Sequence, residues 1–194
     1  ETASADIVAL FDGSRGVLGT PGTAFLPGSF NPLHEGHTQM RADASRRIGK
    51  PVQFELCVRN VDKALLDFIE LARRRRQFNE SECVLTNTPT FVEKANVLGQ
   101  GNGVTFVVGV DTIKRIGETR YYVDSAARDA ALHELESLGT EFLVYGRLSD
   151  HGFETLDDLS LPPALNRISA GVSEQDFRVD VSSTEMRNDS PAPT

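Results

Sequence analysis

Two of the chain's four histidines stand three residues apart, in the stretch LPGSFNPLHEGHTQM that covers residues 26–40. His34 and His37 follow a Gly-Ser-Phe-Asn-Pro turn and precede residues that favour a helix. Neighbouring imidazoles can form a metal centre, pack as a buried pair in the core, or donate hydrogen bonds to a phosphate. The stretch alone is compatible with all three.

The spacing argues against a metal. A helical metalloprotease motif needs its histidines four residues apart with a glutamate after the first, whereas here Gly36 lies between histidines three residues apart. No cysteine and no third histidine is near them in the sequence, so we expect no metal ion held by the protein. Burial in the core is also disfavoured, because the loop is rich in turn-forming rather than apolar residues.

A phosphate site fits the order of elements better. A short apolar run at residues 23–26 ends in Pro27-Gly28, and a Gly-Ser turn lets the backbone approach a ligand closely. The helix that follows offers free N–H groups and the positive end of its dipole. Imidazoles placed there can stabilise the charge that develops during group transfer to or from a phosphate.

A second stretch with anion-binding chemistry is VSSTEMR, residues 181–187. Ser182 with Glu185 three residues later is a capping-box pattern, which predicts the start of a short helix. The pattern could be only a helix cap. Ser183 and Thr184 add hydroxyls and Arg187 adds a guanidinium within one turn, so the same helix start could also hold an anion.

The rest of the sequence alternates buried strands with helices. The run at 104–110 is nearly continuous in apolar residues, as expected for a strand buried on both faces of a parallel sheet. The pattern predicts strands at 23–26, 52–58, 83–85, 104–110 and 141–145, and helices at 37–48, 63–78, 91–98 and 125–138. We therefore predict an α/β fold in a single domain, with a doubly wound, Rossmann-like parallel sheet that binds ligands at the carboxyl ends of its strands.

We expect the folded domain to span residues 23–188. Residues 1–22 are expected to be an N-terminal extension or linker, and residues 189–194 a flexible tail. The polar stretch at 149–171 is expected to connect elements rather than to form one. Because the first residue is Glu1 rather than Met, we also expect the chain to be processed or part of a longer protein.

Composition limits the partners. The net charge of −8, from 20 basic and 28 acidic residues, argues against a general nucleic-acid binder, which needs a basic face. No run of about 18 apolar residues occurs, so we expect no membrane span. Cys57 and Cys83 match no metal or redox spacing and are expected to be buried thiols, which favours a reducing, cytoplasmic compartment. The sequence leaves open whether the chain forms a homo-oligomer or is one domain of a fusion.

Together the two motifs resemble those of the nucleotidyltransferase α/β phosphodiesterase superfamily, which has a HUP-type fold. Residues 28–37 are similar to its GSFNP turn and (H/T)xGH signature, and residues 181–187 to its ISSTxxR signature. Asn31 favours the branch of nicotinamide or nicotinate mononucleotide adenylyltransferases, because phosphopantetheine adenylyltransferases usually have Asp there.

Three further loops resemble that branch. They are Asp62-Lys63 before an arginine-rich stretch, Gly109-Val110-Asp111, and Tyr145-Gly146-Arg147. The chain departs from the branch in having no tryptophan, on which many members stack the pyridine ring, and Tyr121 or Tyr122 is the expected substitute.

The resemblance implies transfer of AMP from ATP to the mononucleotide, with release of pyrophosphate, Mg²⁺ bound with ATP, and no covalent intermediate. It implies His37, His34 and Arg187 as catalytic residues and Lys63, Arg75 and Arg76 as ligands of the acceptor's phosphate. The nucleotide would be bound by Gly28, Ser29, Phe30, Asn31, Gly36, Gly109, Asp111, Arg147, Ser182, Ser183 and Thr184.

Alternatives remain open at this point. The acceptor could be another phosphorylated small molecule, with ATP or CTP as donor, or the chain could be a non-catalytic nucleotide-binding domain. Residues 73–76 could be a solvated helix face, Asp111 could cap the next helix, and Arg147 could simply pair with a nearby carboxylate.

Overall fold

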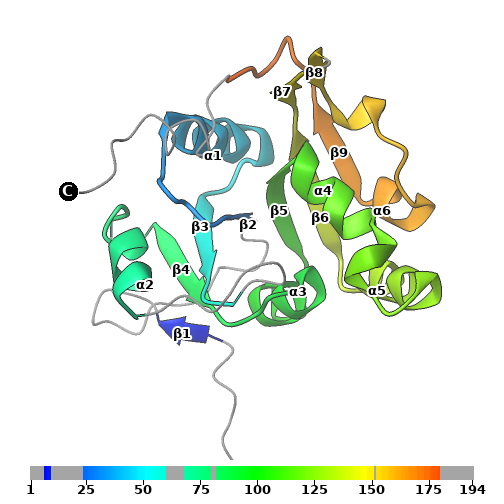
Figure 1. Ribbon diagram of the computed structural model, residues 1–194, viewed down its shortest axis with the longest axis horizontal. Coiled ribbons are helices and arrows are strands. Elements are labelled where there is room, and N and C mark those ends of the chain that lie inside the picture. Colours follow the sequence, from blue (N-terminus) through cyan, green and yellow to red (C-terminus); the bar gives the residue numbers. More distant parts are fainter. Residues whose placement is uncertain (1–6, 10–23, 60–67, 80–81, 151, 180–194) are drawn as a thin grey trace, which may run out of the picture.

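The computed structural model describes residues 7–9, 24–59, 68–79, 82–150 and 152–179 (Figure 1). In this part of the chain one sheet has the strand order β1-β4-β3-β2-β5-β6-β9. Its strands are β1 (Ile7–Ala9), β2 (Ala24–Pro27), β3 (Val52–Cys57), β4 (Cys83–Thr86), β5 (Val104–Gly109), β6 (Thr140–Tyr145) and β9 (Ser169–Val172). All neighbours are parallel except β1, which pairs antiparallel with β4 at one edge. The predicted parallel α/β sheet is confirmed.

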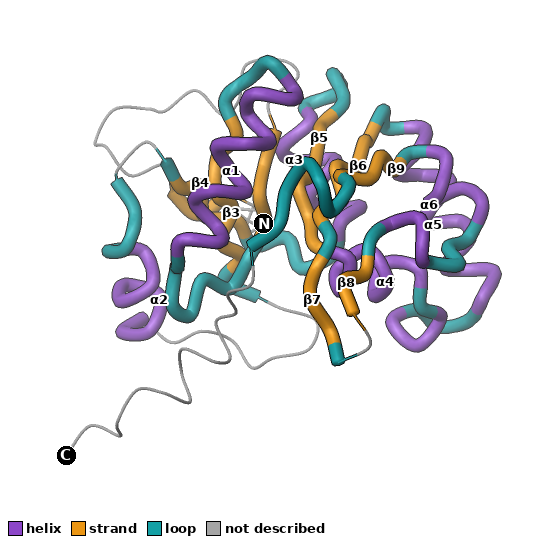
Figure 2. The backbone as a smooth tube through the Cα atoms, turned by 90° about the horizontal axis from the view of Figure 1, so that it is seen from above, coloured by secondary structure: helices purple, strands orange, loops and turns teal. Residues whose placement is uncertain are grey.

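Helices cover both faces of this sheet. They are α1 (Glu35–Ile48), α2 (Phe68–Arg75), α3 (Phe91–Gly99), α4 (Val110–Gly117), α5 (Ser125–Ser137) and α6 (Pro163–Arg167), with 3-10 turns at Thr119–Tyr121 and Leu156–Asp158. Figure 2 shows the strands following one another from β4 to β9, with α2 beyond β4 and α5 and α6 near β9. The fold is therefore doubly wound.

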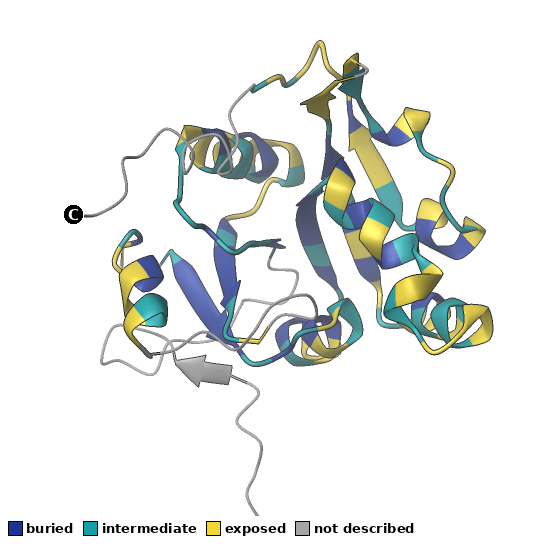
Figure 3. Ribbon diagram, viewed as in Figure 1, coloured by how far each residue is buried: buried dark blue, intermediate teal, exposed yellow. Residues whose placement is uncertain are grey.

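Each face has its own apolar core, because successive residues of a strand point to opposite faces. Phe54 and Leu56 of β3 pack with residues of α1 and α2. Phe106 and Val108 of β5 pack instead with residues of α3, α4, α5 and α6. Figure 3 shows strands β3, β4 and β5 almost wholly buried between these helices.

The strand order reverses between β2 and β5, and the two strands stay together only briefly. Their parallel pairing joins Ala24 to Thr105 and Phe25 to Phe106, and no later pair is formed. On its other side β2 stays paired with β3 as far as Pro27 opposite Glu55. An opening at the carboxyl ends of β2 and β5 results, at the topological switch point where such sheets bind ligands.

Three segments differ from the sequence prediction. Residues 149–171, expected to be a connection, contain α6 and the start of β9, and also complete a hairpin of β7 (Arg147–Ser149) with β8 (Gly152–Glu154). Strand β9 was missed because Ser-Ala-Gly-Val has few apolar side chains, although it pairs with β6 along its length. Strand β1 lies inside the segment expected to be an extension, and α4 begins at Val110, which was assigned to the preceding strand.

Candidate functional site

The Gly-Ser-Phe-Asn-Pro turn follows β2 and is shaped by a buried phenylalanine. The N–H of Gly28 donates a 3.0 Å hydrogen bond to the carbonyl of Glu55, which extends the β2–β3 pairing into the turn. Phe30 then adopts a left-handed backbone with φ 43° and turns its ring into the core. A Cβ at position 28 would lie 2.6 Å from that ring, so glycine is required here to make room for Phe30.

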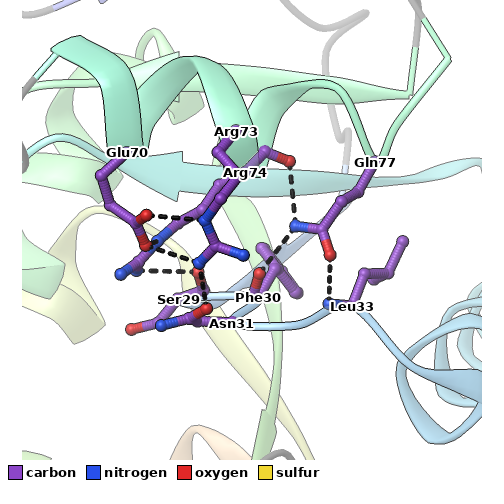
Figure 4. Close-up of polar contacts among 8 residues, drawn as sticks. All are labelled: Ser29, Phe30, Asn31, Leu33, Glu70, Arg73, Arg74 and Gln77. Atoms are coloured by element: carbon purple, nitrogen blue, oxygen red, sulfur yellow. Dashed lines mark hydrogen bonds and ion pairs between the residues drawn. The ribbon is translucent and has the colours of Figure 1, made fainter. Parts of the chain in front are cut away.

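Side chains from α2 and from the residues just after it are hydrogen-bonded to this turn (Figure 4). The side-chain amide of Gln77, just after α2, donates to the Phe30 carbonyl at 2.9 Å and accepts from the Leu33 N–H at 2.8 Å. Arg74 donates to the Ser29 carbonyl at 3.0 Å. Three hydrogen bonds from one helix end therefore fix the turn that leads to the histidines.

Glu70 organises the arginines that make these contacts. Its carboxylate accepts from Arg73 and from Arg74, each at 2.7 Å, and Arg73 also donates to the side-chain oxygen of Asn31. The hydrogen bond from Arg73 is the main reason that the pKa of Glu70 is lowered to about 2, so the carboxylate stays charged. Asn31 was predicted to bind nucleotide, and the structure shows its side chain held by Arg73.

The arginine run is thus only in part the solvated face considered above. Arg74 and Arg75 are both 8% exposed, and Arg75 donates to the carbonyl of Phe78 at 2.9 Å. Only Arg73 and Arg76 of the run are exposed. The sequence did not single out Arg73 and Arg74, because nothing local marks which arginines meet the turn 42 to 45 residues earlier.

The two histidines stack at the start of α1. His34 is the N-cap residue of the helix, and the centroid of its ring lies 3.7 Å from that of His37. The backbone N–H of His34 donates a hydrogen bond to Nδ1 of His37 at 3.3 Å. A neutral imidazole that accepts at Nδ1 carries its proton on Nε2. Nε2 of His37 is therefore a hydrogen-bond donor.

Burial keeps both rings neutral at pH 7. Desolvation, followed by the proximity of His34, lowers the pKa of His37 from 6.5 to about 4, and desolvation also lowers the pKa of His34. Nδ1 of His34 is buried and has no hydrogen-bond partner in the described ranges. Within those ranges no three His, Cys, Asp or Glu side chains are grouped as metal ligands.

The segment after β9 returns to the histidines. Phe177 packs edge-on against Tyr145, with 4.8 Å between the ring centroids. A carboxylate oxygen of Asp176 lies 3.8 Å from a guanidinium nitrogen of Arg47 in α1. Val179 comes so close to Gly36 that a Cβ on the glycine would be 3.3 Å from it. Gly36 therefore allows this segment to pass against the first turn of α1. The remaining predicted residues, Lys63, Ser182, Ser183, Thr184 and Arg187, lie outside the described residues.

Asp111 and Arg147 meet across the carboxyl ends of β5 and β6. Arg147 donates to the carboxylate of Asp111, and the two side chains are 53% and 54% exposed. Gly109, not Asp111, is the N-cap of α4, so the capping alternative for Asp111 is wrong. The alternative that Arg147 pairs with a carboxylate is confirmed.

Both signatures lie inside a region that matches a known family. The sequence model described as cytidylyltransferase-like matches residues 25–189. The chain belongs to the cytidylyltransferase-like family. Membership supports nucleotidyl transfer, with nucleotide and small-molecule substrates, as the activity of the chain. No curated protein matches the chain significantly, and none of the described helices is long and apolar enough to cross a membrane.

In this cytidylyltransferase-like protein a cavity of about 480 Å³ opens on the sheet face opposite α1. It begins at Gly28 and Ser29 of the turn and extends between α3, α4 and α5. Its wall includes both tyrosines expected to replace a tryptophan, Tyr121 and Tyr122, whereas Arg75 and Arg76 do not line it. The structure thus does not bring those two arginines to the cavity that adjoins the turn.

The cavity also contains residues that the sequence did not single out. Glu55 and Lys94 form an ion pair in its wall. Cys57, expected to be buried like Cys83, is only partly buried and lines the same cavity. The sequence did contain one sign of this ion pair, because Glu55 is a charged residue at an inward position of a buried strand. Its partner, Lys94, is 39 residues away in the sequence.

Proposed function

We propose that this protein transfers AMP from ATP to nicotinamide or nicotinate mononucleotide and releases pyrophosphate. The observation that carries the proposal is the neutral, Nε2-protonated imidazole of His37, fixed at a helix start beside the switch point of the sheet. A donor in that position suits phosphoryl oxygens, where backbone N–H groups and the helix dipole also favour an anion.

In the proposed reaction, a phosphate oxygen of the mononucleotide attacks the α-phosphorus of ATP. The bond from that phosphorus to the oxygen bridging the α- and β-phosphates breaks, and pyrophosphate takes the electron pair. Bound with ATP, Mg²⁺ would neutralise charge on the departing phosphates. His37 donates from Nε2 to an oxygen of the triphosphate, so it stabilises the transition state without accepting a proton.

The path of the chain supports a contribution from the second signature. Val179 packs against Gly36 in the first turn of α1. The second signature begins two residues later in the sequence, at Val181. We propose that the β- and γ-phosphates are bound by Ser182, Ser183, Thr184 and Arg187.

The cavity supports an acceptor with a flat ring. Phe91, Tyr121 and Tyr122 line it, and it adjoins the turn at Gly28 and Ser29. An acceptor placed there would have its ring among the aromatic side chains and its phosphate toward the turn. Asp111 and Arg147, at the ends of β5 and β6, are proposed to contact the nucleotide.

The test is to incubate the chain with ATP, Mg²⁺ and nicotinamide or nicotinate mononucleotide, and to measure dinucleotide and pyrophosphate. His37→Ala is expected to lower the rate at which both products form by at least about 10²-fold. Parallel reactions with CTP as donor, and with other phosphorylated acceptors, test the remaining members of the reaction class. Pyrophosphate release only with another donor or acceptor would overturn the proposed substrates, and ATP binding without turnover, unaffected by His37→Ala, would overturn catalysis.

A further inference from the structure

Two oppositely charged side chains form part of the cavity wall, yet both are almost fully buried. Glu55 of β3 and Lys94 of α3 are 1% and 5% exposed, and Lys94 Nζ lies 2.7 Å from Oε1 of Glu55. Thr86 of β4 donates its hydroxyl to the same carboxylate oxygen. The pair therefore joins α3 to two neighbouring strands, β3 and β4.

Stability alone does not account for such a pair. Taking two charges out of water is costly, and well-packed apolar residues of similar volume are often at least as stabilising. The geometry also leaves hydrogen-bonding capacity unused. Both bonds to Glu55 end on Oε1, so Oε2 is without a partner among the described residues. The Lys94 ammonium has three hydrogens and uses one for Glu55.

The cavity thus presents an acceptor and a donor side by side. A primary carboxamide matches both, because its oxygen can accept from Lys94 while its NH₂ group donates to Oε2 of Glu55. A carboxylate of the same shape has no hydrogen to donate and would place a second negative charge against Glu55. Like charges brought together in a buried site are strongly disfavoured.

We propose that the Glu55–Lys94 pair selects an acceptor bearing a neutral carboxamide and rejects the corresponding carboxylate. The inference rests on the proposed function and makes it more specific, because it names the amide form of the pyridine mononucleotide as the preferred acceptor. The ring itself is held by the aromatic wall described above, and Glu55 and Lys94 determine which substituent it carries.

The experiment compares kcat/KM for nicotinamide and nicotinate mononucleotide in the same enzyme sample with ATP and Mg²⁺. The unmodified protein is expected to prefer the amide by about 100-fold, since a site built to hydrogen-bond a substrate N–H strongly rejects an analogue without it. In Glu55→Gln the new amide NH₂ can take the place of Oε2 and donate to a carboxylate. We expect the preference to fall by at least about tenfold and to move toward the acid.

The ratio of two kcat/KM values is independent of the fraction of folded enzyme, so partial unfolding of Glu55→Gln does not disturb it. Glu134→Gln removes another carboxylate that lines the cavity and is expected to leave the ratio unchanged. The double variant Glu55→Gln/Lys94→Met avoids an unpaired buried charge and should lose discrimination.

The outcomes separate the two proposals. No turnover of either mononucleotide would overturn the proposed function. Turnover of both with equal efficiency, a preference for the acid in the unmodified protein, or a ratio that Glu55→Gln leaves unchanged would overturn only the assignment of the pair. The measurement on the unmodified protein stands even where a variant fails to fold.

Discussion

The backbone N–H of His34 is hydrogen-bonded to Nδ1 of His37, and this contact determines which nitrogen of His37 can serve a ligand. Nδ1 completes the first turn of α1, while Nε2 carries the proton. Structural and chemical roles are therefore divided between the two nitrogens of one ring, and substitutions can separate them.

Asparagine and glutamine each mimic one nitrogen of histidine. The oxygen of His37→Asn can replace Nδ1 as the acceptor for His34, whereas the NH₂ group of His37→Gln can replace Nε2 as a donor. Loss of one transition-state donor typically lowers kcat by about 10²–10³. The kcat of His37→Asn should therefore fall by that factor, and the kcat of His37→Gln should fall less. Pyrophosphate release at saturating substrate measures both, and equal kcat values would contradict the division of roles.

Acidification should destabilise the fold through His37. Its pKa is about 4 in the folded protein against an ordinary 6.5, so between these values the unfolded chain binds more protons. The stabilising contribution is complete above about pH 6.5 and is lost progressively as the pH falls toward 4. Urea unfolding at pH 7.5, 6.0 and 5.0 should show a steeper decline for the unmodified chain than for His37→Asn. Parallel declines would rule out His37 as the source.

Removing Gln77 should impair catalysis without touching the reacting groups. Gln77→Leu deprives the Phe30 carbonyl and the Leu33 N–H of their partners, and leaving partly buried groups unpaired costs about 1–3 kcal/mol. A small displacement of the turn is expected to lower kcat about tenfold or more with little change in KM. Gln77→Glu keeps the acceptor for the Leu33 N–H but loses the donor to the Phe30 carbonyl. Its kcat should therefore lie between that of the unmodified protein and that of Gln77→Leu.

Gln175→Leu is the matched control for this series, because Gln175 is exposed in the segment after β9. It should change neither kcat nor stability. A fall in stability of Gln77→Leu with an unchanged kcat would mean that the hydrogen bonds of Gln77 to the turn serve only the fold.

Gly28→Ala should destabilise the protein by about 1–3 kcal/mol, because the added methyl group overlaps the buried ring of Phe30. The cost should shrink in a Phe30→Ala background, and a double-mutant cycle in urea gives this coupling. Gly99→Ala is the control, since a Cβ there meets only Val104, at an ordinary contact distance of 3.6 Å. Equal costs in both backgrounds would exclude Phe30 as the reason for glycine.

Arg147→Ala separates a structural from a functional ion pair. Both partners are about half exposed, and exposed pairs contribute about 0–1 kcal/mol. Unfolding free energy should therefore change little, while KM for ATP should rise at least about tenfold if the guanidinium contacts the nucleotide. Lys114→Ala breaks the nearby pair with Glu154, 2.5 Å long, and should leave KM unchanged. A loss of stability with an unchanged KM would remove Arg147 from the proposed site.

Much of the fold was predictable because its signals are local. Apolar runs such as 104–110 and helix stops such as Gly49, which is left-handed at φ 71°, stand out in a few neighbouring residues. Strand β9 had no such signal, because its strand conformation depends on pairing with β6 rather than on its own side chains.

The candidate site divides in the same way. His34, Gly36 and His37 could be found from their spacing, because they lie on one turn of one helix. The contacts of Gln77 and the partnership of Glu55 with Lys94 join distant parts of the chain, so only the folded structure shows them.

Pro27 has a consequence for the opening between β2 and β5. The N–H of Gly28 is directed to β3, and successive residues of a central strand direct their N–H groups to opposite neighbours. An N–H at position 27 would therefore face β5 just beyond the last pair of the two strands. Proline has none, so the sheet divides here without leaving an amide hydrogen unpaired. Any other residue at this position would add a backbone donor at the edge of the cavity, where a ligand or a water would have to accept from it.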